Sequence, residues 1–116
     1  MKHVILDTNF VLSCIRKKID FFDEIRFMGL QIIIPRQVIE EIKGLAKSKP
    51  EAKIALKLLE KNEFKTVSLK GKNVDNGIIN IAKKNENYVI ATLDREIKNK
   101  TKNQKLVIRG KKLEVL

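Results

Sequence analysis

The feature of this sequence that most restricts its fold is an alternation of short apolar runs with longer segments of helical periodicity. The runs VIL (4–6), LQIII (30–34) and YVIATL (88–93) are almost continuously apolar, as expected of strands buried on both faces. FKTVSL (64–69) alternates between apolar and polar residues and predicts a further strand. We expect helices at 9–16, 20–28, 35–48, 50–61, 74–85 and 94–101, and a final strand pair at 105–110 and 111–116.

Strands that alternate with helices predict an α/β domain. Each strand returns to the sheet through a helical crossover, so the sheet is mainly parallel and helices cover both of its faces. We therefore expect residues 1–116 to form a single domain around a central, mainly parallel sheet of about five strands. In such sheets, the residues that follow the carboxyl ends of the strands line the binding crevice.

The chain is strongly basic, with 25 Lys and Arg against 14 Asp and Glu and a formal net charge of +11. A charge of this size favours phosphate-rich partners, and nucleic acid is the natural candidate. The alternative is a surface on which lysines serve only as ion-pair partners. A stretch of seven basic residues without an acid favours a phosphate-facing edge: Lys98, Lys100, Lys102, Lys105, Arg109, Lys111 and Lys112.

Several other classes of protein are disfavoured. No run approaches the ~18 apolar residues that a membrane span needs, and the amino terminus does not resemble a signal peptide. The single cysteine, Cys14, lies in an apolar run and is expected to be buried, which suits a reducing cytoplasm. His3 is the only histidine and precedes the first strand, which disfavours a nucleophile activated by histidine. The scattered glycines form no phosphate-binding loop.

Three of the five aspartates stand where a site would place them. Asp7 directly follows the first apolar run and Asp94 follows YVIATL, while Asp75 lies within ~60° of the centre of its helix's apolar stripe. Each acid alone is well explained as a helix cap or first-turn acid, worth ~1 kcal/mol. Together they would raise one another's pKa unless a cation were present. Carboxylate oxygens without His or Cys favour Mg²⁺ or Mn²⁺ over zinc.

Four acid-bearing motifs occur in a characteristic order, namely LDTN, PRQVIEEI, VDNGI and ATLDREIK. In this order on an alternating α/β chain, they resemble the PIN-domain ribonucleases over nearly the whole sequence, from Val4 to Leu116. The ending DREIKNKTKNQKLVIRGKKLEVL is similar to the branch of that family associated with ribosomal RNA processing. The resemblance implies that residues 1–116 are one PIN-like nuclease domain, a metal-dependent endonuclease of single-stranded RNA.

The resemblance also implies the residues of the site. Asp7, Glu41, Asp75 and Asp94 would be both the catalytic residues and the ligands of Mg²⁺ or Mn²⁺. The substrate-binding residues would be Thr8, Asn9, Thr92, Arg95, Lys98, Lys100, Lys102 and Lys105, although a solvated surface position explains Arg95 equally well. Asn76 stands where the family often has a further acid, so the sequence leaves open whether one or two ions bind.

Helical geometry distinguishes Glu41 from its neighbour Glu40. The apolar stripe of this helix is formed by Val38, Ile39, Ile42, Leu45 and Ala46. Glu40 lies ~160° from the centre of that stripe and is expected to face solvent, whereas Glu41 lies ~100° away, at the border between the buried and exposed faces. Geometry and family pattern therefore both select Glu41.

Two other functions stay open. An RNA-binding or assembly module could keep the fold without cutting, although the four intact acids count against it. A toxin of a toxin–antitoxin pair would share the chemistry and bind a small acidic antitoxin. The sequence does not identify the RNA, and it leaves open whether the chain forms a homodimer.

Overall fold

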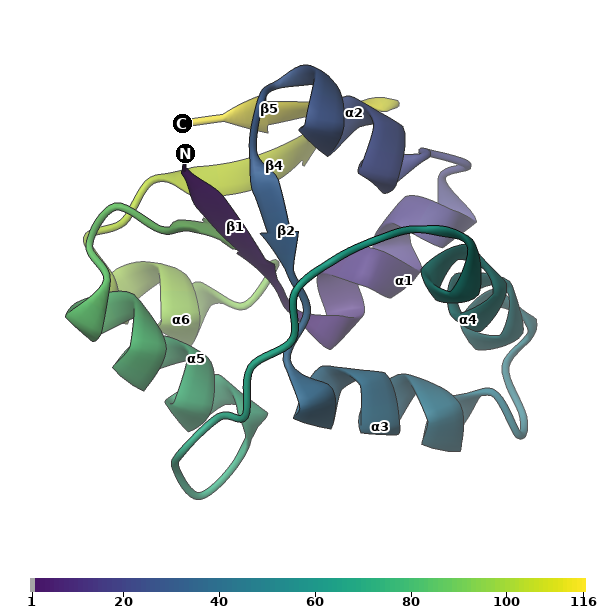
Figure 1. The fold of residues 1–116 in the computed structure, drawn as a ribbon, viewed down its shortest axis with the longest axis horizontal. Helices are drawn as coiled ribbons and strands as arrows, with labels where there is room; N and C mark the ends of the chain where they lie inside the picture. The colour runs from purple at the N-terminus through teal and green to yellow at the C-terminus, as the bar shows by residue number, and fades with distance from the viewer. Residues whose placement is uncertain (1) are drawn as a thin grey trace.

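Residues 2–116, which the computed structural model describes, form a five-stranded sheet in the order β2-β1-β3-β4-β5 (Figure 1). The strands are β1 (His3–Leu6), β2 (Gln31–Ile33), β3 (Val89–Ala91), β4 (Lys105–Arg109) and β5 (Lys112–Val115). The first three and β4 run parallel, and β5 pairs with β4 in the antiparallel sense. The predicted fold class and strand number are confirmed.

Six helices connect or flank these strands in the described part of the chain. They are α1 (Thr8–Arg16), α2 (Phe21–Phe27), α3 (Arg36–Leu45), α4 (Pro50–Lys61), α5 (Val74–Lys84) and α6 (Arg95–Lys100). Pro50 opens α4 as the sequence predicts, because a residue at the first helical position needs no N–H partner within the helix. None of these helices has the length and apolar character that crossing a bilayer requires.

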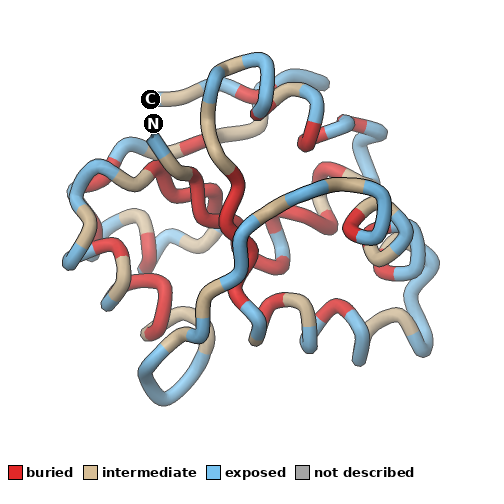
Figure 2. Tube along the Cα trace, viewed as in Figure 1, coloured by how far each residue is buried: buried red, intermediate tan, exposed pale blue. Residues whose placement is uncertain are grey.

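Alternate residues of the strands pack on opposite faces of the sheet. Val4 and Leu6 of β1 join the larger core, to which α1, α2, α3 and α4 contribute. Ile5 points to the other face, where it packs with Ile78 of α5 and Ile97 of α6. Figure 2 shows the buried strands running through the centre of the molecule between these two sets of helices. Burial on both faces explains why the strands are continuously apolar in sequence.

The strand predicted at 64–69 is wrong. Within residues 2–116, that segment contributes one isolated parallel bridge, between Lys65 and Ile33. Further along, the Arg36 amide donates to the Val67 carbonyl at 2.9 Å. Because β2 gives way to a helix so soon, the segment has no extended partner with which to build a ladder. The alternating pattern is real: the Lys65 amide donates to the Ile32 carbonyl at 2.9 Å, and the Ile34 amide donates to the Lys65 carbonyl at 2.8 Å, but the pairing ends where α3 begins.

One buried asparagine joins three segments of the chain. Asn103 is 6% exposed, and its Nδ2 donates to the carbonyls of Ala82, Asn85 and Tyr88 at 3.2, 2.9 and 2.9 Å. It therefore holds the end of α5 against the start of β3.

We predict that Asn103→Ala lowers the free energy of unfolding by about 2 kcal/mol, because it leaves buried carbonyls without their donor. The exposed Asn99 serves as a control, and Asn99→Ala should change stability by less than about 0.5 kcal/mol. Urea unfolding monitored by circular dichroism measures both values. Equal stability of the two variants would show that the Asn103 amide contributes nothing.

Candidate active site

The carboxyl ends of β1 and β3 bring Asp7 and Thr92 together. Leu6 pairs with Ala91 in parallel register, so the next residue of each strand stands at the same level of the sheet. The Asp7 amide donates to the Ala91 carbonyl at 3.0 Å, and the Thr92 hydroxyl donates to Asp7 Oδ2 at 2.9 Å. Asp7 is only 6% exposed. Its carboxylate is therefore held at the edge of the sheet, largely removed from water.

The same hydroxyl links Asp7 to Asp94. Thr92 Oγ1 accepts from the Asp94 amide at 3.1 Å, and Asp94 Oδ1 accepts from the Ile97 amide at 3.1 Å. Asp94 thus caps α6, and Asp7 occupies the equivalent position before α1. The helix-cap interpretation of these acids is correct, and it does not compete with a site, because both caps lie at the edge where the parallel strands end.

A threonine connects Asp7 to Glu41 on α3. The Thr8 amide donates to Asp7 Oδ1 at 2.7 Å, and the Thr8 hydroxyl donates to Glu41 Oε1. Glu40 and Glu41 are both exposed residues, but this bond directs Glu41 toward the strand ends. The helical geometry that separated the two neighbours agrees with this placement.

Asp75 interacts electrostatically with the other acids of the cluster. Burial raises the pKa of Asp75, and the charges of Asp94, Glu41 and Glu96 raise it further. Burial is also the main cause that raises the pKa of Asp7, with repulsion from Asp75 and Glu41 added, while hydrogen bonds from Thr92 and Thr8 act in the opposite direction. The four predicted acids therefore share one electrostatic environment.

Glu96 is an acid of this environment that the sequence analysis missed. It lies in the first turn of α6, two residues after Asp94. Its Oε1 forms an ion pair with Lys100 Nζ at 2.7 Å. The stretch DRE contained the signal, since a second acid in a first helical turn stays near the strand end from which the helix starts.

The chemistry of the donor set fits a hard divalent cation. All four acids offer carboxylate oxygens, which Mg²⁺ and Mn²⁺ prefer. A cation would relieve the repulsion that adds to burial in raising the pKa values of Asp7 and Asp75. Within residues 2–116, however, no three acidic, histidine or cysteine side chains are gathered closely enough to hold a metal ion as they stand. The acids form a loose cluster and not a finished coordination cage.

The predicted RNA-binding residues have different surroundings. Asn9 and Arg95 are exposed in the first turns of α1 and α6, beside the acids. Lys98 is half-exposed and Lys102 is exposed. The Lys105 ammonium instead donates to the carbonyls of Thr101 and Asn103, and burial is the main cause that lowers its pKa. Lys105 thus has a structural role as well as a charge.

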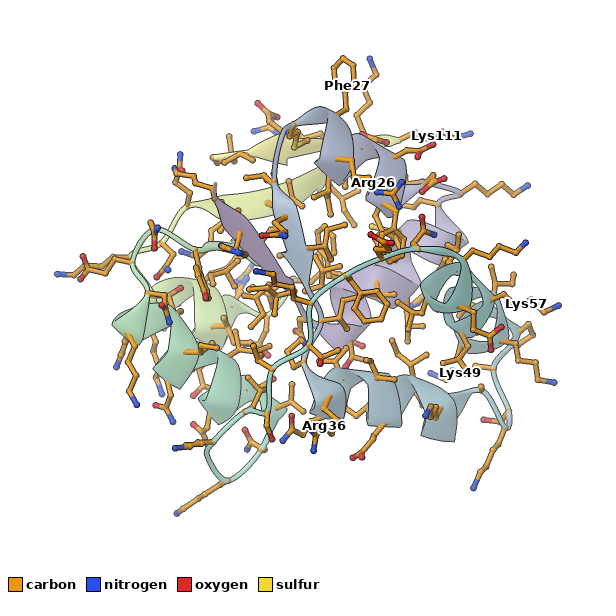
Figure 3. All side chains as sticks on the ribbon, viewed as in Figure 1. Arg26, Phe27, Arg36, Lys49, Lys57 and Lys111 are labelled. Atoms are coloured by element: carbon orange, nitrogen blue, oxygen red, sulfur yellow. The ribbon has the colours of Figure 1, made fainter. Side chains whose placement is uncertain are left out.

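The basic turn between β4 and β5 lies away from the acids. Lys111 and Lys112 line a cavity with Asp23, Glu24 and Phe27 of α2. Figure 1 shows α2 and β5 at the end of the molecule opposite to the carboxyl end of β1, and Figure 3 shows Lys111 and Phe27 there. The basic stretch of the sequence is therefore divided between two regions of the surface.

The fold and the acid cluster define an α/β protein of the nuclease type, with carboxylates at the ends of parallel strands. The family model described as a PIN like domain matches residues 4–111, and the chain belongs to that family. The predicted resemblance is confirmed. The roles of the individual site residues remain predictions.

Relatives of known name agree with this family. The chain is 33% identical over 123 residues to Ribonuclease VapC4 of Methanocaldococcus jannaschii, covering 97% of this chain and 94% of the relative. It is 29% identical over 105 residues to the rRNA-processing protein fcf1 of Schizosaccharomyces pombe, covering 84% of this chain and 52% of that protein. Among solved structures, the PIN domain endonuclease Utp24 superposes with a TM-score of 0.82 at 26% identity, covering 97% of this chain and 90% of the other.

We predict that, in the absence of a divalent cation, Asp7→Asn raises the melting temperature at neutral pH by a few degrees. The folded-state pKa of Asp7 is raised, so ionisation of Asp7 costs folding free energy above that pKa, and the amide removes this cost. As the pH falls through the folded pKa toward the ordinary value of 3.8, the wild type becomes protonated and the difference should vanish. Thermal unfolding in EDTA from pH 3 to 8 tests this, and a variant less stable than wild type at neutral pH would contradict it.

Proposed function

We propose that residues 1–116 act as a PIN-like endoribonuclease domain that uses Mg²⁺ or Mn²⁺ at the acid cluster. The observation that carries this proposal is the buried Asp7 carboxylate, which is fixed by Thr92 and Thr8 among acids that repel it. A fold does not keep such an arrangement for stability, because burial and repulsion both oppose the charged form. The names of the relatives supply the substrate class.

Each acid has a proposed role. Asp7 and Asp94 would hold the cation, and Asp75 and Glu41 would complete its surroundings directly or through water. When bound, the cation supplies an activated water and neutralises charge on the leaving oxygen of the phosphodiester. Thr92 orients Asp7 and Asp94 through one hydroxyl.

Other residues would hold the RNA strand. Asn9 and Arg95 are exposed beside the acids, and Lys98 lies one turn further along α6. The hydroxyls of Thr8 and Thr92 donate to carboxylates, so we assign them to positioning the acids before any contact with RNA.

The biological setting is either ribosomal RNA processing or a toxin–antitoxin pair. The name of the fcf1 protein supports rRNA processing, and that of Ribonuclease VapC4 supports the ribonuclease activity that both settings share; the chain spans about half of the former and nearly all of the latter. Both settings would use the same chemistry and differ in partner, and we propose that this chain acts in the cytoplasm. Co-purification of a small acidic protein that blocks cleavage would favour the toxin, whereas the chain alone, or as a homodimer, cutting a defined ribosomal RNA would favour processing.

We predict that Glu41→Gln lowers metal-dependent RNA cleavage at least ~100-fold, as expected for loss of a positioned catalytic or ligand group. Glu40→Gln should stay near wild type in rate and stability, because Glu41 and not Glu40 accepts the hydrogen bond from Thr8 beside Asp7. Initial rates on a labelled single-stranded RNA with Mn²⁺ and with EDTA test both variants. Equal losses would mean that Glu41 is wrongly assigned, and absence of cleavage by the wild type would support the non-cutting RNA-binding module.

RNA binding should depend on salt through the basic residues nearest the acids. Replacing Arg95 and Lys98 by Ala should reduce the slope of log K against log salt by about 0.7 for each lost phosphate contact. The matched control replaces Lys111 and Lys112, which changes the net charge equally at the opposite end of the molecule. Fluorescence anisotropy with Asp7→Asn as the common background measures the slopes. An equal effect of the two pairs would show that the RNA path is not beside the acids.

A further inference from the structure

Gln37 forms two hydrogen bonds that tie α3 to a distant segment. Its Nε2 donates to the Leu69 carbonyl at 3.2 Å, and its Oε1 accepts from the Leu69 amide at 3.1 Å. An uncharged amide side chain is suited to pair with a peptide group in this way, because it offers a donor and an acceptor together. Gln37 lies one helical turn before Glu41, on the same face of α3.

The other side of this segment is fixed to α5. A Cβ on Gly77 would stand 2.6 Å from Leu69 Cβ, so the absence of a side chain at Gly77 lets Leu69 lie against the helix. Asn80 Nδ2 also donates to the Lys70 carbonyl at 3.1 Å. Gly77 and Asn80 belong to the helix whose first turn carries Asp75. Leu69 therefore connects the helix of Glu41 to the helix of Asp75.

We propose that the bridge Gln37–Leu69–Gly77 is a positioning device that sets the separation between Glu41 and Asp75, and thereby the affinity of the acid cluster for a divalent cation. The inference rests on the proposed cation site. Gln37 is a positioning residue here, since it acts through the Leu69 backbone and not on the ion.

The charges of the two acids explain why such a device is needed. Glu41 and Asp75 repel each other, and they lie on two separate helices, α3 and α5. An uncharged side chain such as Gln37 opposes that repulsion without adding charge to the acid cluster. A carboxylate in place of Gln37 would add an acid and lose the donor, whereas a lysine would lose the acceptor.

The first test measures Mn²⁺ binding by thermal shift, a readout independent of RNA cleavage. Gln37→Met keeps the length of the side chain and removes both bonds, and Gly77→Ala displaces Leu69 from the other side. Both variants should raise about tenfold the Mn²⁺ concentration that gives half of the maximal shift in melting temperature. This factor lies in the range known for residues that orient metal ligands. In cleavage assays kcat should fall while KM for RNA changes little, because the RNA-contacting residues are unaltered.

The matched control is Asn62→Ala. The Asn62 amide also donates and accepts: it donates to the Leu58 carbonyl of its own helix and accepts from Arg26 of α2, at the end of α4. A loss of stability without a change in the Mn²⁺ midpoint is expected there. If wild type responds to Mn²⁺ and both bridge variants keep its midpoint, the inference is overturned and the proposed function stands. If wild type shows no response to Mn²⁺, both fail.

A second measurement reports the geometry directly. Spin labels at Glu40→Cys on α3 and Lys83→Cys on α5 occupy exposed positions, and the buried native Cys14, whose pKa is raised to about 12, does not compete for the label. Double electron–electron resonance should give a narrow distance distribution in the parent and a broadened or longer one with Gln37→Met. An unchanged distribution in a folded Gln37→Met variant would overturn the bridge.

Discussion

The burial of the Asp7 carboxylate is the constraint on which the rest of the site depends. Removing this group from water raises its pKa, and two further acids add to the effect. Two hydrogen bonds, from the Thr92 hydroxyl and the Thr8 amide, offset part of that cost. Burial of the Asp7 carboxylate thus lowers the stability of the fold, a cost that is common where a site serves function instead of stability.

The parallel sheet determines where the carboxylates gather. β1 and β3 are neighbours, and the helices that follow them, α1 and α6, begin at the same edge of the sheet. The amino ends of these helices carry partial positive charge, which stabilises carboxylates in their first turns and at their caps. Because each such strand end is followed by a helix start, capping residues gather there without any special device. Hydrogen bonds at these caps therefore offset part of the cost that burial and mutual repulsion impose on the acids.

Much of the site was accessible from local sequence. The positions of Asp7 and Asp94 followed from the ends of apolar runs, and helical geometry separated Glu41 from Glu40. The strand predicted at 64–69 failed because alternation describes burial on one side but not the availability of a partner strand. Glu96 was missed because it does not directly follow an apolar run, as Asp7 and Asp94 do.

By itself, the sequence determined the layered α/β architecture, the family and the order of the four acids, since these depend on periodicity and on short motifs along the chain. Tertiary structure alone decided that Thr92 joins Asp7 to Asp94 and that Lys105 donates to backbone carbonyls. It also decided that Gln37 forms hydrogen bonds with the Leu69 backbone. Gln37 and Leu69 are separated by 32 positions, and Thr92 and Asp7 by 85. Local periodicity carries no information on such pairs, because their contact is set by how helices and strands pack after the chain has folded.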